Sequence, residues 1–258
     1  MARDAASLAR TLAERHAARA TFTSIFDEDE TPDLAFAYEV QAAFVAGLGG
    51  DTAGYKIGLT TPRMQEMCGV SEPICGVVLK GRILRSPATV RAADYVRLGL
   101  ESEMAVRIAP GADQRGLAVR DLPAHHLIDQ VCAGFELVED SGADYRRLTA
   151  ASIVADNGWN AGLVFGEPSP AAAYGPLRGR RGVLKLNGAA VNEGKSEDVL
   201  GDPLNAVRWL AGRLQDRGGL KPGMWVSTGA IVPTRFVAPG ETYVFEIDGL
   251  APVTLKVA

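Results

Sequence analysis

The sequence predicts an α+β protein, with a helical N-terminal extension at residues 1–50 and a β-rich body at residues 51–258. In the extension, apolar residues recur at helical spacing. From Gly54 onward the pattern changes to short runs rich in β-branched residues, broken by glycine and proline. Asn187-Gly188 and Asp248-Gly249 each separate two such runs, as hairpin turns with positive φ require. No linker or internal repeat divides the body, which favours one structural unit.

The extension predicts two helices. Leu8 and Leu12 lie one turn apart in a segment rich in alanine and arginine. A second helix begins at Thr31-Pro32, where a cap residue precedes a proline at the first helical position, and Gly49-Gly50 ends it. We expect its apolar stripe to pack on the rest of the fold. The stripe consists of Leu34, Tyr38, Val45 and Leu48, with Gln41 interrupting it.

The body predicts three helices between its strands. Thr61-Pro62 opens a short helix that stops at Gly69, a second helix runs from Leu122 to Cys132, and the clearest runs from Pro203 to Arg217. The candidate strands are bounded by glycine, proline, asparagine or aspartate. They are residues 54–58, 76–79, 98–108, 135–138, 161–165, 183–186, 224–227, 242–247 and 252–257.

The composition is that of an ordinary globular protein. Of the 258 residues, 47% are apolar and 22% are charged, and the formal net charge is -4. Acidic and basic residues are interspersed, which gives no electrostatic footprint for nucleic acid or an anionic membrane surface. No stretch is long and apolar enough to cross a bilayer, and the first 20 residues lack the apolar core of a secretory signal. We therefore expect the partners to be small molecules or other copies of the chain.

Several common site types are poorly supported. Cys68, Cys75 and Cys132 are too few for a disulfide framework and lack the spacing of a zinc site. They fit a reducing cytoplasm, most simply as small buried hydrophobic residues. The three histidines all fall in predicted helices, which disfavours Ser-His-Asp or Cys-His chemistry. No glycine-rich nucleotide motif follows a strand, so nucleotide cofactors are not expected.

The strongest chemical signal is Glu101-Ser102-Glu103, inside the strand-like run Leu98 to Ile108. Side chains two apart on a strand point to the same face, so the two carboxylates converge. Adjacent anions are costly unless a proton or a cation lies between them. Oxygen ligands with no histidine or cysteine nearby suit a hard ion such as Mg²⁺ or Mn²⁺. A half-exposed strand that carries alternate glutamates and no metal is the simpler alternative.

Glu136 is the natural third ligand. It lies between Phe135 and Leu137, and an acid among apolar neighbours is costly unless something compensates its charge. An exposed position on an edge strand is the alternative explanation. Glu139 and Asp140 compete with Glu136 for the role of ligand.

Lys56 is a candidate acid-base group or substrate clamp, because Gly54 and Gly58 leave room for close approach of a ligand. A surface lysine beside two packing glycines is equally compatible with this pattern. Asp156-Asn157-Gly158 and Ser227-Thr228-Gly229 are suited to presenting amides and hydroxyls to a carboxylate ligand. Either segment could also be an ordinary turn.

Short motifs occur in a fixed order from about the second helix to the C-terminus. They are Gly54-Tyr55-Lys56-Ile57-Gly58-Leu59-Thr60, Gly69-Val70, Glu72-Pro73, Gly76, Glu101-Ser102-Glu103, Phe135-Glu136-Leu137, Ala155-Asp156-Asn157, Asn187-Gly188, Leu200-Gly201-Asp202-Pro203, Trp209-Leu210, Thr228-Gly229 and Pro239-Gly240. As an ordered set they closely resemble the 2-keto-4-pentenoate hydratase and 4-oxalocrotonate decarboxylase family. That family is a branch of the fumarylacetoacetate hydrolase superfamily.

The resemblance implies a mixed β-sandwich or roll of the fumarylacetoacetate hydrolase C-terminal type, a bound Mg²⁺ or Mn²⁺ ion, and a homo-oligomer. By matching position, the metal ligands would be Glu101, Glu103 and Glu136, and the catalytic lysine would be Lys56. The resemblance also implies a set of substrate-binding residues. These are Leu59, Ile74, Asp156, Asn157, Thr228 and Gly229.

The chain departs from the family's patterns at three places. In the related carbon-carbon hydrolases the third ligand is typically an aspartate and a histidine serves as base, so Glu136 and the lack of a suitable histidine make hydrolysis the weaker branch. Ile74 stands where many hydratases carry an acidic residue and where the decarboxylase branch often has isoleucine. Gly158-Trp159-Asn160 replaces a serine-rich stretch, which leaves the identity of the substrate open.

The resemblance favours a hydratase that acts on a small unsaturated 2-oxo acid in the catabolism of aromatic-derived acids. It would add water to a 2-hydroxy-2,4-dienoate or 2-oxo-alkenoate and give a 4-hydroxy-2-oxo acid. The first alternative is a decarboxylase of the 4-oxalocrotonate type, which needs the same electron sink and could use Ile74 to desolvate the departing carboxylate. The second is a non-catalytic small-acid-binding protein of the same fold. The presence of Lys56 with all three glutamates favours an enzyme.

Overall fold

Two β-sheets form the body of the protein in a computed structural model that describes residues 4–27, 33–112 and 124–258. The larger sheet has eight strands, in the order β2-β1-β11-β5-β6-β7-β3, with β8 paired to β6. Its strands are β1 (Thr52–Gly58), β2 (Ile74–Leu79), β3 (Ile83–Arg85), β5 (Leu98–Ile108), β6 (Ile128–Glu139), β7 (Asn160–Phe165), β8 (Ser169–Pro170) and β11 (Trp225–Phe236). Both parallel and antiparallel pairs occur, because β1 runs parallel to β11 and β5 runs antiparallel to it.

The smaller sheet has five strands in the order β10-β9-β12-β13-β4. It comprises β4 (Ala88–Val90), β9 (Arg181–Leu186), β10 (Ala189–Lys195), β12 (Thr242–Ile247) and β13 (Val253–Val257). The predicted turns at Asn187-Gly188 and Asp248-Gly249 are confirmed, since each joins an antiparallel pair of this sheet. The ring of Phe135 from the larger sheet lies against the ring of Phe245 from the smaller one. The predicted α+β class is confirmed.

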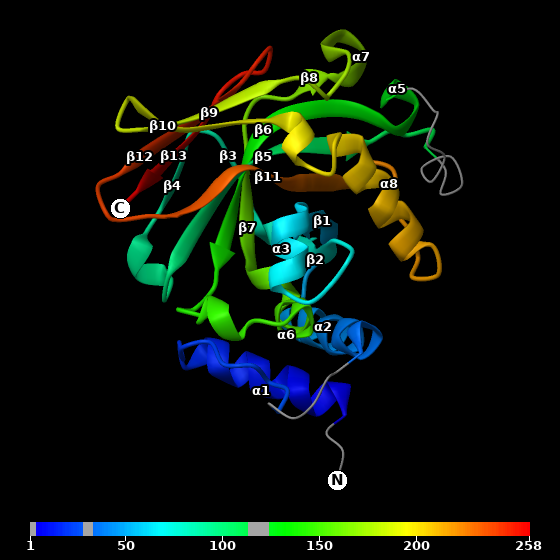
Figure 1. Cartoon of the computed structure of the whole chain (residues 1–258), viewed down its shortest axis with the longest axis vertical. Coiled ribbons are helices and arrows are strands. Elements are labelled where there is room, and N and C mark those ends of the chain that lie inside the picture. The colour runs from blue at the N-terminus through cyan, green and yellow to red at the C-terminus, as the bar shows by residue number, and fades with distance from the viewer. Residues whose placement is uncertain (1–3, 28–32, 113–123) are drawn as a thin grey trace.

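The helices are short apart from α1 (Ala5–Ala17), α2 (Leu34–Leu48) and α8 (Pro203–Leu214). The others are α3 (Pro62–Met67), α5 (Ala124–Leu127), α6 (Ala150–Ala155) and α7 (Ala171–Tyr174). In Figure 1, α1 and α2 lie together at the end of the molecule away from the five-stranded sheet. Within the described residues, no helix combines the length and the apolar character needed to span a membrane.

Two helices begin after the cap residues that the sequence predicts. Thr61 caps α3 and Asp202 caps α8, each followed by a proline. The expected start of the second helix at Thr31-Pro32 lies outside the described residues, and the described cap of α2 is Asp33. In the expected stripe of α2, Tyr38 is buried whereas Leu48 is exposed.

Gln41 lies on the buried face of α2 and has a structural role. Its Nε2 donates to the carbonyl oxygens of Cys75 (2.8 Å) and Val154 (3.0 Å). These bonds fix α2 to β2 and to α6. The polar residue that interrupts the apolar stripe is therefore a buried connection between three elements, because buried amide groups require partners.

The predicted helix from Leu122 to Cys132 is wrong. Within the described residues only α5 is helical there, and Ile128 begins the long strand β6. This strand pairs with β5 from Ile128 opposite Ile108 to Glu139 opposite Leu98. Most of β6 is buried on both faces. Such a strand reads as a continuous apolar run, and a short apolar run does not distinguish a strand from a buried helix.

His16 fixes the C-terminal end of α1 to the body. Its Nε2 lies 2.6 Å from Oδ1 of Asp156, directly after α6, and its ring stacks on Phe44 of α2. The hydrogen bond with Asp156 raises the pKa of His16, burial and Arg82 lower it, and the charges of Asp156 and Glu139 raise it further. The net effect is a raised pKa, so protonated His16 stabilises the docked helix.

We expect the substitution His16→Gln to cost more stability at acidic than at basic pH. A pKa raised in the folded state gives stabilisation that is fully present below the unfolded value, about 6.5, and is lost as the pH rises through the folded value. The difference in Tm between wild type and variant should be larger near about pH 6 than near about pH 9. Equal differences at both values would contradict a contribution from the charged imidazole.

Candidate metal centre

Three glutamates meet on adjacent strands of the larger sheet. Glu101 and Glu103 share one face of β5, as their spacing predicts, and Glu136 of β6 pairs directly with Glu101. One carboxylate oxygen from each residue lies within 4.8 Å of the other two. Glu103 and Glu136 are fully buried, and Glu101 is half-buried. The antiparallel register of β5 and β6 therefore creates the cluster.

Hydrogen bonds hold one oxygen of each carboxylate. Oε2 of Glu103 accepts from Ser227 Oγ (2.6 Å) and from the amide of Gly229 (2.8 Å). Asn160 Nδ2 donates to Oε1 of Glu136 at 2.9 Å, and Thr234 Oγ1 donates to Oε1 of Glu101 at 2.7 Å. The carboxylates are therefore oriented by donors from β7 and β11.

The other oxygens of the two buried carboxylates, Oε1 of Glu103 and Oε2 of Glu136, have no hydrogen-bond partner among the described residues. A buried carboxylate oxygen without a partner is costly, so a cation or a proton is expected beside it. The donor set consists of oxygen atoms alone and suits a hard divalent ion. Glu101, Glu103 and Glu136 could thus hold Mg²⁺ or Mn²⁺.

The pKa shifts of the buried glutamates agree with a site for a divalent cation. Burial raises the pKa of Glu103, and the negative charges of Glu136 and Glu101 raise it further. Burial also raises the pKa of Glu136, although Lys56 opposes that shift. Both pKa values are raised because the anions repel one another in a site with little solvent. A divalent cation would remove this repulsion.

Lys56 of β1 lies beside the cluster, with its Nζ 3.3 Å from Oε1 of Glu136. Its side chain is almost fully buried. Burial lowers the pKa of Lys56, but the attraction of Glu136, Glu101 and Glu103 outweighs burial and the net pKa is raised. The ammonium group and Asn160 share one oxygen of Glu136, so the lysine, the amide and the carboxylate form one connected unit.

Gly158 leaves the space that Lys56 occupies. A Cβ atom at this position would lie 2.5 Å from Cε of Lys56, and the φ of Gly158 is +60°. Its neighbours Asn157 and Trp159 also have positive φ, at 50° and 60°. Non-glycine residues adopt this conformation at a cost and persist in it only where surrounding contacts impose it. The side chain of Asn157 supplies such contacts, bonding to the amide and the carbonyl of Val77 at 2.7 and 2.9 Å.

A cavity of about 420 Å³ opens beside Lys56 and Glu101. Leu59 and Ile74, both expected to contact substrate, line it. Thr228 and Gly229 are not among the described lining residues of this cavity. Thr228 Oγ1 donates to the carbonyl of Met104, and the amide of Gly229 donates to Glu103, so both support the strand that carries the glutamates.

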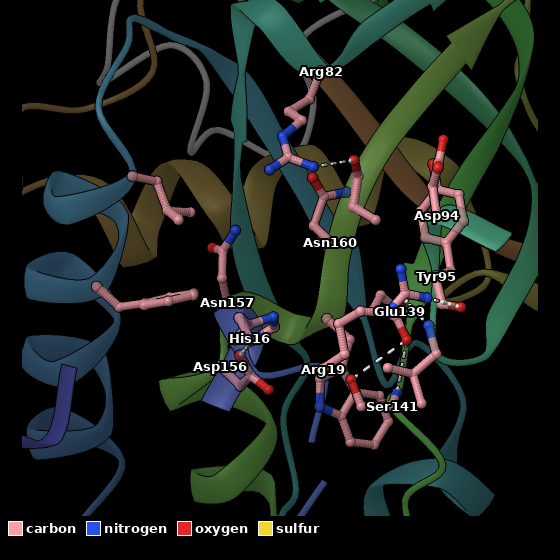
Figure 2. A pocket seen from close by; sticks show the side chains of 15 residues that line it. His16, Arg19, Arg82, Asp94, Tyr95, Glu139, Ser141, Asp156, Asn157 and Asn160 are labelled. Carbon is pink, nitrogen blue, oxygen red and sulfur yellow. Dashed lines mark hydrogen bonds and ion pairs between the residues drawn. The ribbon is translucent and has the colours of Figure 1, made fainter. Parts of the chain in front are cut away.

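Asp156 and Asn157 lie on a different cavity, of about 240 Å³, which is shown in Figure 2. The side chain of Asp156 bonds to His16, and that of Asn157 bonds to Val77. Neither Lys56 nor Glu101 lines this second cavity. The structure therefore does not bring Asp156 and Asn157 together with the other expected substrate-binding residues.

Three residues that orient the glutamates were not predicted as site residues. They are Asn160, Ser227 and Thr234, which come from β7 and β11. Ser227 precedes Thr228-Gly229 in a segment singled out by its sequence, and Asn160 ends the segment that departs from the family pattern. For Ser227 and Asn160, the available signal was a polar side chain within a segment that the sequence singles out, whereas no such signal marks Thr234.

Comparison with known proteins yields relatives that match nearly the whole chain. A 2-keto-4-pentenoate hydratase of Paraburkholderia phymatum is 29% identical over 254 residues, which cover 96% of this chain and 95% of the relative. A 4-oxalocrotonate decarboxylase of Pseudomonas putida is 29% identical over 209 residues, which cover 81% of this chain and 78% of the relative. The sequence comparison thus finds both expected branches.

A solved structure has the same fold over nearly its full length. It is 4-oxalocrotonate decarboxylase from Pseudomonas putida G7, complexed with magnesium and adipate. The TM-score is 0.87 at 24% identity, and the match covers 98% of this chain and 97% of that one. A sequence profile of the fumarylacetoacetate (FAA) hydrolase C-terminal family matches residues 67–258. This protein therefore belongs to the fumarylacetoacetate (FAA) hydrolase C-terminal family.

Proposed function

We propose that this protein is a divalent-metal-dependent hydratase that adds water to a 2-hydroxy-2,4-dienoate of the 2-keto-4-pentenoate type. The observation that carries the proposal is the meeting of Glu101, Glu103 and Glu136 within 4.8 Å, with Lys56 3.3 Å from Glu136. The near full-length relative that is a 2-keto-4-pentenoate hydratase supports the choice of reaction. A protein that only bound an acid would have no need of a buried lysine in contact with a cluster of three buried or half-buried carboxylates.

The three glutamates would hold Mg²⁺ or Mn²⁺ through their free oxygens. When bound, the ion would supply Lewis acidity toward the 1-carboxylate and 2-oxygen of the substrate. Ser227, Gly229, Asn160 and Thr234 would keep the glutamates in place, since each donates to an oxygen of one of them. Such supporting donors fix the ligands before the metal arrives.

Lys56 would move the protons of the reaction. Its Nζ would deliver a proton to the terminal carbon of the diene and would regain one from the 2-hydroxyl group, giving a conjugated 2-oxo-alkenoate. Water would then add at carbon 4 and a proton at carbon 3, which completes a 4-hydroxy-2-oxo acid. The pairing with Glu136 holds the ammonium group at the edge of the cavity, in position to act on the substrate.

A decarboxylase of the 4-oxalocrotonate type remains the second candidate. The observation in its favour is Ile74, which is buried and forms part of the cavity wall where an acid occurs in many hydratases. We further propose that the enzyme acts as a homo-oligomer in a reducing cytoplasm. The free, buried state of Cys68, Cys75 and Cys132 supports the reducing compartment.

We expect purified protein with Mg²⁺ or Mn²⁺ to convert 2-hydroxypenta-2,4-dienoate, followed by loss of the dienol absorbance and by identification of the hydroxy-oxo acid. EDTA should abolish turnover, and Glu103→Gln should reduce it on the order of 10³-fold because a ligand to the Lewis acid is lost. Supplying a six-carbon unsaturated dicarboxylate and measuring CO₂ distinguishes the decarboxylase. Activity undiminished by the chelator would overturn the proposed mechanism.

Ser227→Ala should weaken Mg²⁺ binding about 10- to 100-fold in calorimetric titrations, since residues that support metal ligands usually contribute that much. Ser102→Ala is the matched control, because Ser102 stands between the two ligands in sequence but points to the opposite face of β5, and its buried Oγ has no hydrogen-bond partner among the described residues. It should leave metal affinity unchanged and stability equal or slightly higher. Equal losses in both variants would show that Ser227 does not act through Glu103.

Lys56→Met should lower kcat about 10²- to 10⁴-fold, the usual contribution of a general acid or base. Binding of Mg²⁺ should persist, because the lysine is not a ligand and its positive charge opposes the metal. Lys185→Met is the control, since this lysine pairs with Glu246 on the five-stranded sheet, away from the cavity. Loss of metal binding together with activity would assign Lys56 a structural role instead.

A further inference from the structure

The cavity beside Lys56 is larger than a five-carbon acid requires. Its volume of about 420 Å³ falls in the range of pockets that enclose drug-sized ligands, roughly 300–1,000 Å³. The acid of the proposed reaction has only about eight non-hydrogen atoms, so it would fill the part next to the glutamates and leave the remainder open. The side chains that line the rest of the cavity indicate which group the natural substrate carries beyond its reacting carbons.

The walls away from the strands of the cluster carry several apolar side chains. Met64 and Met67 come from α3, Leu148 precedes α6, and Ile153 lies within α6. Ile74 of β2 continues this surface and is almost fully buried. Of the uncharged hydroxyl groups in the lining, those of Thr60 and Thr234 lie on the side of the glutamates, with Lys56 and Glu101. The hydroxyl of Thr61 accepts from the amide of Met64, and that of Tyr145 donates to Asp140. The cavity therefore has a polar end and an apolar end.

Among the described lining residues, Lys56 is the only buried positive charge that could pair with a second carboxylate. Apart from Lys56 and Glu101, the charged residues among the described lining are Arg63 and Asp198. Both are exposed and they have opposite signs. Asp198 is already an acceptor for the amide of Lys195. A carboxylate placed against Met64 and Leu148 would face only carbon and sulfur atoms of these side chains and would gain no hydrogen-bond donor from them.

We propose that the natural substrate carries an apolar tail beyond its conjugated carbons, and that it is an alkyl-substituted monoacid in preference to a dicarboxylate. This inference rests on the proposed function for the placement of the 2-oxo acid end at the glutamates. Met64 and Met67 suit tails of varied shape, because the unbranched thioether adapts to irregular partners. The proposal therefore specifies the class of tail, alkyl and uncharged, and no single chain length.

Calorimetry with saturated 2-oxo acids tests the tail directly. These acids present the same carboxylate and 2-oxo group but lack the double bonds needed for turnover. With the Mg²⁺-loaded enzyme, Kd should fall about fourfold for each methylene added from 2-oxopentanoate to 2-oxooctanoate, the gain typical of a buried CH₂. The diacid 2-oxoadipate should bind no tighter than 2-oxopentanoate. A Kd that does not change with chain length, or tightest binding of the diacid, would overturn the proposal.

Variants test whether the apolar wall causes the dependence of Kd on chain length. Met64→Gln keeps the length of the side chain and adds polarity, so the dependence of Kd on chain length should become shallower. Met224→Gln is the matched control, since Met224 is a half-buried methionine that does not line the cavity, and it should leave the dependence unchanged. Arg63→Ala should change the Kd of 2-oxoadipate less than twofold. A large loss in Arg63→Ala would mean that the arginine receives a second carboxylate, against the proposal.

The same experiments separate this inference from the proposed function. If the enzyme fails to hydrate 2-hydroxypenta-2,4-dienoate but binds longer 2-oxo acids more tightly, the hydratase proposal fails and the tail preference stands. If it hydrates that substrate but binding is independent of tail length, the reaction stands and the tail preference fails. Alkyl-substituted 2-hydroxy-2,4-dienoates should then show no gain in kcat/KM over the parent substrate.

Discussion

The repulsion between three carboxylates in a site with little solvent determines the surrounding structure. Glu103 and Glu136 are fully buried, and their pKa values are raised by burial and by neighbouring negative charge. Such a cluster is stable only if donors and a cation offset its charge. The chain supplies the donors at one oxygen of each glutamate, from β7 and β11. Two buried oxygens of the cluster have no hydrogen-bond partner among the described residues, which is the arrangement expected of a metal site prepared in advance.

Oε1 of Glu136 would connect the proposed metal centre to Lys56, the proposed acid-base group. It accepts from Asn160 and also lies 3.3 Å from Lys56. The other oxygen of Glu136 remains free for a metal. One carboxylate would thus orient both a bound ion and the lysine, so that the position of each would depend on the other. The left-handed backbone from Asn157 to Trp159 belongs to the same unit, since Gly158 provides the room for the side chain of Lys56.

The sequence predicts features that depend on neighbouring residues, but it does not predict contacts between residues that lie far apart in the chain. The alternation in Leu98 to Ile108 predicts β5 and the shared face of Glu101 and Glu103, because strand periodicity is local. The register that places Glu136 opposite Glu101 depends on β6, whose two buried faces resemble a helix in sequence. Ser227 reaches Glu103 across 124 positions of the chain, and no spacing rule reveals such a contact. Asp156 and Asn157 line the second cavity, where their side chains bond to His16 and Val77, and such contacts between residues far apart in the chain cannot be read from spacing.

The choice between adding water and releasing CO₂ is made at the end of the substrate far from the glutamates. Both reactions send an electron pair toward the 2-oxygen, so both would use the same cluster and the same lysine. Release of CO₂ requires a second carboxylate that is first bound and then desolvated, and a wall such as Ile74 supplies only the desolvation. Addition of water requires a polar route to carbon 4, and Thr60 and Thr234 line the same cavity. A few wall residues could therefore change the reaction while the metal centre stays the same, because the step that differs never touches the glutamates.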